Sequence, residues 1–329
     1  MRRVLQVGAG GFGRRWSAVL TGSRAMGIEL AGLVDTDPSV LAARGGELGL
    51  DESQRFVSLG AALEAVRPEI VVCVTPPSSH ADVAIAALEA GSHVLVEKPL
   101  APSMEEAERM ALAAERTGRR LAVSQNYRYE PHAMAVREVL RSGRLGEPES
   151  FTASFHRGPR GEISYRKSMR YPLLVDMSIH HYDLMRFFLG REPEWTFAKS
   201  FNPPWSWFEG DASVAQVIGF AGGAVGAYSA SWCAQARETP WGGEWRFDCT
   251  GGVVEWKDGR VVLEPVGGTM EEVPPVNAVY HGQEAVLAGF LEALDSGRDF
   301  ETDVRDNLRS LNMVFRTIQA CESGSVVRF

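Results

Sequence analysis

Lys98 is the residue of this chain that is best placed to do chemistry. It lies in the tripeptide Glu97-Lys98-Pro99, directly after the apolar run from His93 to Val96. In open α/β sheets ligands bind beyond the carboxyl ends of the strands, so a lysine at such an end is directed towards a ligand. The chain has four lysines against thirty arginines, and lysine offers a compact ammonium with a tunable pKa. The alternative is a surface lysine paired with Glu97, but Pro99 stiffens the strand exit and favours a fixed side chain.

A second group of titratable residues lies in one segment. Asp176, His180 and Asp183 fall in a run that starts after Pro172 and stops at Gly190, which is typical of a helix. Spacings of four and three residues predict that the three side chains share one helix face. Because a histidine beside a carboxylate is a natural general base, the pattern predicts proton transfer. The other interpretation is a helix-terminal acid at Asp176 and a buried, hydrogen-bonded His180.

Two further possibilities for this segment are less favoured. His181 points about 100° away from His180 on the expected helix, so packing is favoured over chemistry for His181. Asp176 and His180, four residues apart, could chelate a metal, but no third ligand stands out and no metal site is predicted.

A glycine-rich loop, Gly8-Ala9-Gly10-Gly11-Phe12-Gly13, follows the first expected strand and opens the first expected helix. Gly8 permits a tight turn, Gly10 lets the backbone approach a pyrophosphate, and Gly13 allows close packing of helix on strand. In this strand-loop-helix context the pattern predicts a nicotinamide dinucleotide site. The cofactor contacts expected from the loop are Gly8, Gly10, Gly11, Phe12 and Gly13.

Asp35 ends the second expected strand, 22 residues after Gly13. A carboxylate there can accept hydrogen bonds from the adenosine ribose hydroxyls. Asp35 and the nearby Asp37 would repel a 2′-phosphate, and the first basic residue that follows is Arg44. NAD is therefore predicted over NADP. Asp37, which precedes Pro38, fits a helix N-cap better than Asp35 does.

The loop Thr75-Pro76-Pro77-Ser78-Ser79-His80 follows the apolar run Ile70 to Val74. It also falls at the carboxyl edge of the expected sheet, so we predict that it lines the cofactor crevice. The alternative for His80 is that it only starts the next helix.

Strand and helix patterns alternate through residues 1–125. The expected strands are 4–7, 29–34, 70–74, 93–96 and 121–124, and the expected helices are 12–20, 38–48, 81–90 and 103–117. Ser103 followed by Glu106 indicates a capping box for the last helix. This rhythm predicts an α/β domain with a doubly wound parallel sheet.

The rhythm changes after an expected helix at 131–142. Strand-like runs follow at 151–156, 213–220, 224–232, 244–249, 252–256 and 260–264, and helices are expected at 283–295 and 303–322. Close spacing and glycine turns predict antiparallel pairing. We therefore expect an α+β second domain over residues 126–329.

Composition limits the possible partners. The 329 residues, 45% hydrophobic and 23% charged, suit a globular protein of two domains. No apolar stretch approaches the roughly 20 residues that span a bilayer, and a net charge of −8 without basic clusters argues against nucleic acid. The four isolated cysteines predict neither disulfides nor zinc. The start Met1-Arg2-Arg3 leaves no room for a secretory leader, so we expect a cytoplasmic protein with a small-molecule partner.

These motifs, in this order, resemble the family of glucose-fructose oxidoreductase, inositol dehydrogenase and the rhizopine-catabolism protein (Gfo/Idh/MocA) over nearly the whole chain. The matching segments are Gly8-x-Gly10-x-x-Gly13, Thr75-Pro76-Pro77-x-x-His80, Ala90 to Pro99, Asn126-Tyr127-Arg128 and Asp176-x-x-x-His180-x-x-Asp183. The resemblance implies a Rossmann domain at 1–125, and at 126–329 a domain for substrate binding and oligomerisation built on a mostly antiparallel, open-faced sheet. It also implies a sugar or cyclitol substrate and a homodimer or homotetramer formed through that sheet.

The resemblance implies a role for several residues. The reacting hydroxyl would contact Lys98, Asp176 and His180. The other implied contacts are Glu97, Lys98 and Asn126 with the cofactor and Arg128 with the substrate.

The chain departs from the family pattern beside the predicted helix. Many members have a glycine run and a glycine at position 178, where this chain has Arg170-Tyr171-Pro172 and Ser178. These bulkier groups leave the identity of the substrate open.

Together these observations predict an NAD-dependent dehydrogenase that oxidises a secondary alcohol of a sugar, sugar derivative or cyclitol, or reduces the ketone. His180 would take the hydroxyl proton while Lys98 stabilises the developing alkoxide. One alternative is an NAD-dependent glycosidase, which would release sugar without net NADH. Another is a non-catalytic NAD-binding sensor, although such proteins often lose the lysine or histidine that this chain retains.

Seven of the eight tryptophans follow residue 190. They could be platforms for sugar rings or packing residues of a sheet, and we favour packing. Trp205 and Trp207 are expected in a loop or an interface.

Overall fold

The computed structural model describes residues 1–158 and 165–329, which divide into two compact units. Unit 1 comprises Met1–Asn126 and Tyr280–Leu308, and unit 2 comprises Tyr127–Val279 and Arg309–Phe329. The sequence predicts one boundary, near residue 125. Residues 280–308 nevertheless group with unit 1, because helix α8 (Gly282–Ser296) packs on α1 (Gly13–Gly22).

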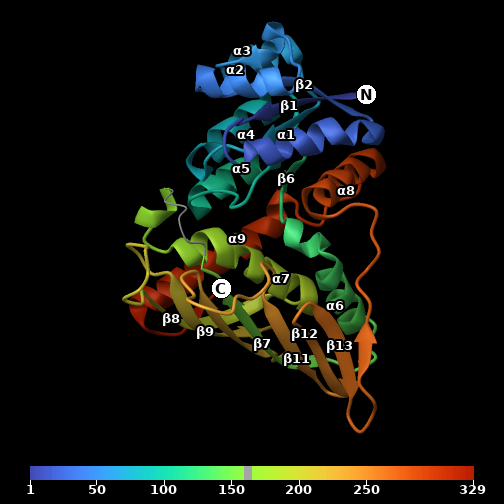
Figure 1. Ribbon diagram of the computed structural model, residues 1–329, viewed down its shortest axis with the longest axis vertical. Coiled ribbons are helices and arrows are strands. Elements are labelled where there is room, and N and C mark those ends of the chain that lie inside the picture. Colours follow the sequence, from blue (N-terminus) through green and yellow to red (C-terminus); the bar gives the residue numbers. More distant parts are fainter. Residues whose placement is uncertain (159–164) are drawn as a thin grey trace. The chain divides into compact units, whose positions relative to one another are not determined.

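Unit 1 is built on a six-stranded parallel sheet in the order β3-β2-β1-β4-β5-β6 (Figure 1). The strands are β1 (Arg2–Val7), β2 (Ile28–Val34), β3 (Arg55–Phe56), β4 (Ile70–Cys73), β5 (His93–Val96) and β6 (Leu121–Val123). Central strands that are buried on both faces have unbroken apolar sequences. Strand β4 is an example, because all four of its residues are apolar and buried. The order reverses between β1 and β4, and at such a switch point the loops after the strands form a ligand crevice.

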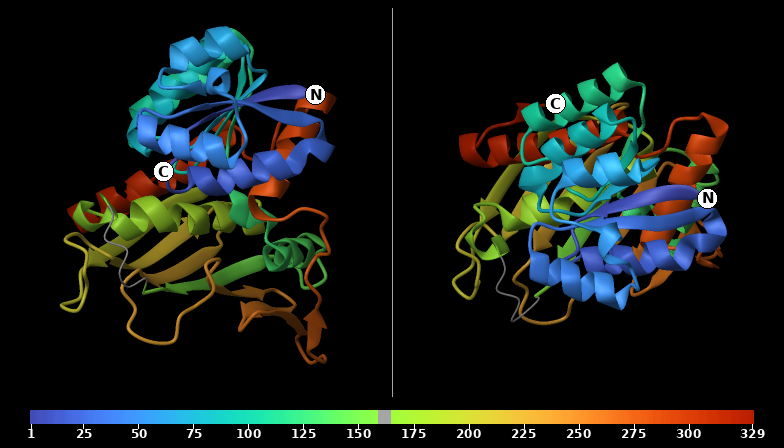
Figure 2. Two further views of the ribbon diagram at one scale, coloured as in Figure 1. Left: turned by 45° about the horizontal axis from the view of Figure 1, so that its top comes forward. Right: turned by 90° about the horizontal axis from the view of Figure 1, so that it is seen from above.

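Helices lie on both sides of this sheet (Figure 2). Besides α1 and α8 they are α2 (Pro38–Glu47), α3 (Leu59–Val66), α4 (His80–Glu89) and α5 (Met104–Thr117). The predicted doubly wound sheet is therefore confirmed. Asp37 caps α2 by accepting from the backbone N–H of Ser39 at 2.8 Å, and Ser103 caps α5 by accepting from Glu106 at 3.2 Å. Strand β3 and helix α3 were not predicted. For β3 the reason is that a two-residue, half-buried strand gives no apolar run.

Unit 2 is built on a nine-stranded sheet in the order β14-β13-β12-β11-β7-β10-β9-β8-β15. The strands are β7 (Pro148–His156), β8 (Pro193–Phe201), β9 (Ser213–Phe220), β10 (Val225–Ser231), β11 (Glu244–Cys249), β12 (Gly252–Lys257), β13 (Arg260–Pro265), β14 (Glu271–Val273) and β15 (Val327–Arg328). The pairing is antiparallel as predicted, except that β7 and β10 run parallel.

Helices α6 (Pro131–Arg141), α7 (Ile179–Leu189) and α9 (Val304–Ser323) lie on one face of the sheet of unit 2 (Figure 1). The opposite face carries apolar side chains in water, with Phe197 43%, Val217 40% and Val225 37% exposed. The sheet is thus open-faced. None of the helices in residues 1–158 and 165–329 is both long and apolar enough to cross a membrane.

The helix predicted after Pro172 does not begin as an α-helix. Leu173–Ser178 form a π-helix, and only then does α7 begin. A π-helix closes its hydrogen bonds over five residues rather than four, so it turns less per residue than an α-helix. The spacing from Asp176 to His180 therefore crosses the junction between the two helix types, whereas His180 and Asp183 both lie on α7 with the predicted spacing of one turn.

Candidate active site

The glycine loop of unit 1 has the conformation that its glycines require. Gly8 has φ +98°, and a Cβ built there would lie 2.6 Å from the carbonyl oxygen of Val74. A Cβ on Gly13 would lie 2.3 Å from the carbonyl oxygen of Gly8. A side chain at either place would clash with backbone, so both positions depend on glycine.

The middle of the loop is open. No atom lies within 4 Å of a Cβ built on Gly10 or Gly11, and both residues are exposed. A pyrophosphate can therefore approach the backbone here, beside the N-terminus of α1. Phe12 is 47% exposed at the same turn.

Asp35 is tied directly to this loop. One carboxylate oxygen accepts from the backbone N–H of Ala9 at 2.7 Å, and the other accepts from Asp37 N–H at 3.0 Å. The nearby Arg44 donates through Nε to the Ala9 carbonyl at 3.3 Å, and its Nη1 pairs with the Glu47 carboxylate. An acid at the loop, with Arg44 already paired, fits a ribose with free 2′- and 3′-hydroxyls.

Glu97 is buried and joins α1 to the strand end that carries Lys98. Its Oε1 accepts from Trp16 Nε1 at 2.7 Å, and its Oε2 accepts from Lys98 N–H at 3.1 Å. Burial raises the pKa of the Glu97 carboxyl, while the Trp16 hydrogen bond opposes that rise. These contacts favour support of Lys98 over direct contact with a cofactor.

His80 links two loops at the same sheet edge. Its Nε2 lies 2.8 Å from the carbonyl oxygen of Thr75, and its Nδ1 lies 3.0 Å from that of Pro99. Burial lowers the pKa of His80. The imidazole therefore holds the segment Thr75-Pro76-Pro77 against the loop that contains Lys98, and it also starts α4, the alternative considered from the sequence.

In unit 2, Asp176 lies in the π-helix and is paired with an arginine that the sequence did not single out. Arg166 Nε donates to Asp176 Oδ2 at 2.7 Å. The Asp176 side chain is 7% exposed and that of Arg166 is 33% exposed. A guanidinium thus lies against a largely buried acid, and the two opposite charges compensate each other.

His180 is 4% exposed and stacks on Tyr127. The two ring centroids are 4.0 Å apart and the planes differ by 8°. The neighbouring His181 is fully buried and has different contacts, with Nδ1 2.7 Å from Tyr228 Oη and Nε2 3.0 Å from the Trp241 carbonyl. His181 thus belongs to the packing, as the sequence indicates.

Asp183 is held by Arg128. Arg128 Nε and Nη2 donate to the two carboxylate oxygens at 2.6 and 2.7 Å, and Ser310 Oγ donates to Asp183 Oδ1 at 2.9 Å. Arg128 is 5% and Asp183 1% exposed. These contacts favour a structural role for Arg128 over the substrate contact implied by the resemblance. Asn126, the last residue of unit 1, is 8% exposed.

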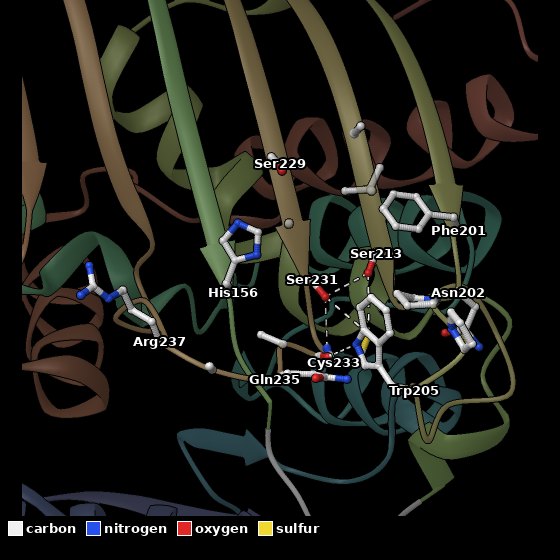
Figure 3. Close-up of a pocket in the computed structure, with 17 residues that line it drawn as sticks. His156, Phe201, Asn202, Trp205, Ser213, Ser229, Ser231, Cys233, Gln235 and Arg237 are labelled. Atoms are coloured by element: carbon white, nitrogen blue, oxygen red, sulfur yellow. Dashed lines mark hydrogen bonds between the residues drawn. The ribbon is translucent and has the colours of Figure 1, made fainter.

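A separate pocket of unit 2 lies where β7, β8 and β10 end and β9 begins (Figure 3). His156, Phe201 and Trp205 line it, and Trp205 Nε1 donates to the Cys233 carbonyl at 3.0 Å. Trp205 is 54% exposed in a loop, as expected from the sequence. In the described parts of both units, no group of three or more His, Cys, Asp or Glu is arranged to hold a metal.

Sequence reasoning did not give roles to Trp16, Tyr127 or Arg166. Trp16 lies 81 residues from its partner and Arg166 lies 10 residues from its own. Tyr127 stands in the segment Asn126-Tyr127-Arg128 that carried part of the resemblance, which is the one signal that could have drawn attention to it.

Two family models match the chain. Residues 2–125 match the oxidoreductase family with an NAD-binding Rossmann fold, and residues 133–255 match the GFO/IDH/MocA C-terminal domain.

Individual proteins are also similar to this chain. Inositol 2-dehydrogenase of Rhizobium meliloti is 30% identical over 57% of this chain and 54% of its own length. D-apiose dehydrogenase of Paraburkholderia graminis is 27% identical over 92% of this chain and 83% of its own length. An Agrobacterium radiobacter oxidoreductase, solved with NAD⁺, L-tartaric acid and magnesium, shares the fold with a TM-score of 0.91 and 22% identity, over 99% of this chain and 98% of that one.

Proposed function

Because this chain belongs to the Gfo/Idh/MocA family of NAD-binding oxidoreductases, we propose that it oxidises a secondary alcohol of a sugar, sugar derivative or cyclitol, or reduces the ketone. The observation that carries the proposal is in unit 1. The open glycine loop, the Asp35 carboxylate bonded to it and Lys98 all follow strand ends at one edge of the parallel sheet. The substrate class is supported by two relatives, which act on inositol and D-apiose by name.

NAD would be held by Gly8, Gly10, Gly11, Phe12 and Gly13, with Asp35 on the adenosine ribose and Thr75-Pro76-Pro77 along the crevice. Glu97 and His80 support this site through the contacts described above. NAD is favoured over NADP because Asp35 has its carboxylate at the loop and Arg44 is paired with Glu47. When bound, nicotinamide supplies the hydride acceptor.

The chain itself handles the proton and the charge. His180 accepts the proton of the reacting hydroxyl, and the Lys98 ammonium stabilises the oxygen as negative charge develops on it. Asp176, paired with Arg166, orients His180 or binds a neighbouring hydroxyl. Water exclusion is aided by the low exposure of His180 and Asp176.

We also propose that the protein forms a homodimer or homotetramer through the open face of the sheet of unit 2. The exposed Phe197, Val217 and Val225 on that face support an interface, because large apolar patches mark association sites. A cytoplasmic location is supported by the four cysteines, all of which are free thiols.

The test is a screen of sugars and cyclitols for NAD reduction, run beside an assay for sugar released from glycosides. Net NADH with at least one free sugar or cyclitol supports the proposal. Sugar release from a glycoside without net NADH would replace it with the glycosidase alternative.

A further inference from the structure

Tyr127 and Arg128 are consecutive residues of the short segment Asn126–Tyr129, and both contact helix α7. Tyr127 stacks on His180, and Arg128 binds Asp183 through two hydrogen bonds. His180 and Asp183 are three residues apart on α7, so they lie one turn from each other. We call this pair of contacts the clasp.

The Arg128 half of the clasp is rigid. A bidentate arginine–carboxylate pair fixes both distance and orientation, and this one is nearly free of solvent. Ser310 adds a third hydrogen bond to Asp183 and in turn accepts from Arg186 Nη1 at 2.9 Å. The backbone at residue 128 is therefore fixed, and the preceding residue, Tyr127, has little freedom to leave His180.

The Tyr127 contact of the clasp restricts the orientation of the His180 ring, which the helix backbone does not set. The second side-chain torsion of histidine is broad, so a helix alone does not set the plane of the imidazole. In addition, α7 follows a π-helix, a form that is common at functional sites and rare elsewhere. A phenol ring lying parallel to the imidazole at 4.0 Å restricts rotation of that plane.

We propose that Tyr127 is a positioning residue that sets the ring plane of His180, and that the Arg128–Asp183 pair holds Tyr127 in place. This inference rests on the proposed role of His180 as the proton acceptor. Proton transfer depends on the direction of the accepting nitrogen, so a rotated imidazole would reduce turnover more than it reduces cofactor binding.

The first measurement compares Tyr127→Leu with Tyr127→Phe, which keeps the aromatic ring. We expect Tyr127→Leu to lower kcat by about tenfold to a hundredfold, and Tyr127→Phe to restore it to within about threefold of wild type. The KM for NAD should change by less than about threefold in both variants, because the clasp lies outside the glycine loop. Equal kcat for Tyr127→Leu and wild type would overturn the proposal.

The second measurement is independent of turnover. The histidine ring protons are recorded by NMR on the free protein, and the His180 signal is identified as the one missing in His180→Asn. The stack predicts a ring-current displacement of that signal in wild type and Tyr127→Phe, and its loss in Tyr127→Leu. An unchanged signal in Tyr127→Leu would show that the rings do not stack and would overturn the clasp. A different outcome is a folded protein in which the His180 signal is displaced but none of the sugars or cyclitols supports NAD reduction. That outcome would contradict the proposed function, and with it the catalytic role of the stack.

Discussion

Asp183 and Arg128 form a bidentate ion pair, at 2.6 and 2.7 Å, from which solvent is almost completely excluded. Ser310 Oγ also donates to Asp183. A buried pair of this kind contributes little when intact and costs a great deal when one partner is lost.

Asp183→Asn should therefore lower the free energy of unfolding by about 3 to 5 kcal/mol, because it leaves the Arg128 charge buried without its counter-ion. Denaturant titration measures this quantity. The matched control is Glu89→Gln, which removes the partner of Arg116 from an ion pair whose side chains are 64% and 52% exposed. That variant should change stability by less than about 1 kcal/mol. Equal effects from the two variants would contradict the buried role of Asp183.

The proposed contact of Asp35 with the adenosine ribose makes a prediction about cofactor choice. Asp35→Ala should raise the KM for NAD about tenfold or more, because ribose hydroxyls lose a charged acceptor, and it should raise the relative efficiency with NADP. Steady-state kinetics with both dinucleotides measures these changes. Asp37→Ala, which removes an exposed helix cap two residues later, serves as the control. An NAD KM that responds to Asp37→Ala and not to Asp35→Ala would refute the assignment.

His181 should make stability depend on pH. Burial lowers the pKa of His181 to about 4, below the value of an unfolded histidine. The unfolded chain therefore takes up this proton first, so the contribution is complete above about pH 6.5 and is lost as the pH falls towards about 4. Between about pH 7 and about pH 5, wild type should lose about 2 kcal/mol more stability than His181→Gln. Unfolding titrations at both pH values check this, and equal losses in the two proteins would show that His181 is not buried in neutral form.

The sequence predicted those parts of the fold whose signal is local. The apolar runs of β4 and β5 and the strand-loop-helix context of Gly8 to Gly13 needed no distant partner to be recognised. Strand β8 was missed because its pattern is inverted: the buried positions include the small Ala198 and Ser200, whereas the exposed ones include Phe197 and Phe201.

For the candidate site, residue types can be read from the sequence, but their arrangement only in part. The spacing of Asp176 and His180 identifies both as candidates. The π-helix that contains Asp176, however, has no signature in hydrophobic periodicity. Their contact partners, Arg166 for Asp176 and Tyr127 for His180, are brought close by tertiary folding, which no local sequence pattern reveals.

We propose that this chain catalyses hydride transfer with Lys98 as the stabilising cation, and the variant Lys98→Met is the decisive test. Methionine keeps much of the length of the side chain and removes its charge. On a sugar or cyclitol that wild type oxidises, Lys98→Met should bind NAD with a Kd within about threefold of wild type, while NADH formation should fall by about a hundredfold or more. A Lys98→Met protein that forms NADH at the wild-type rate would contradict it.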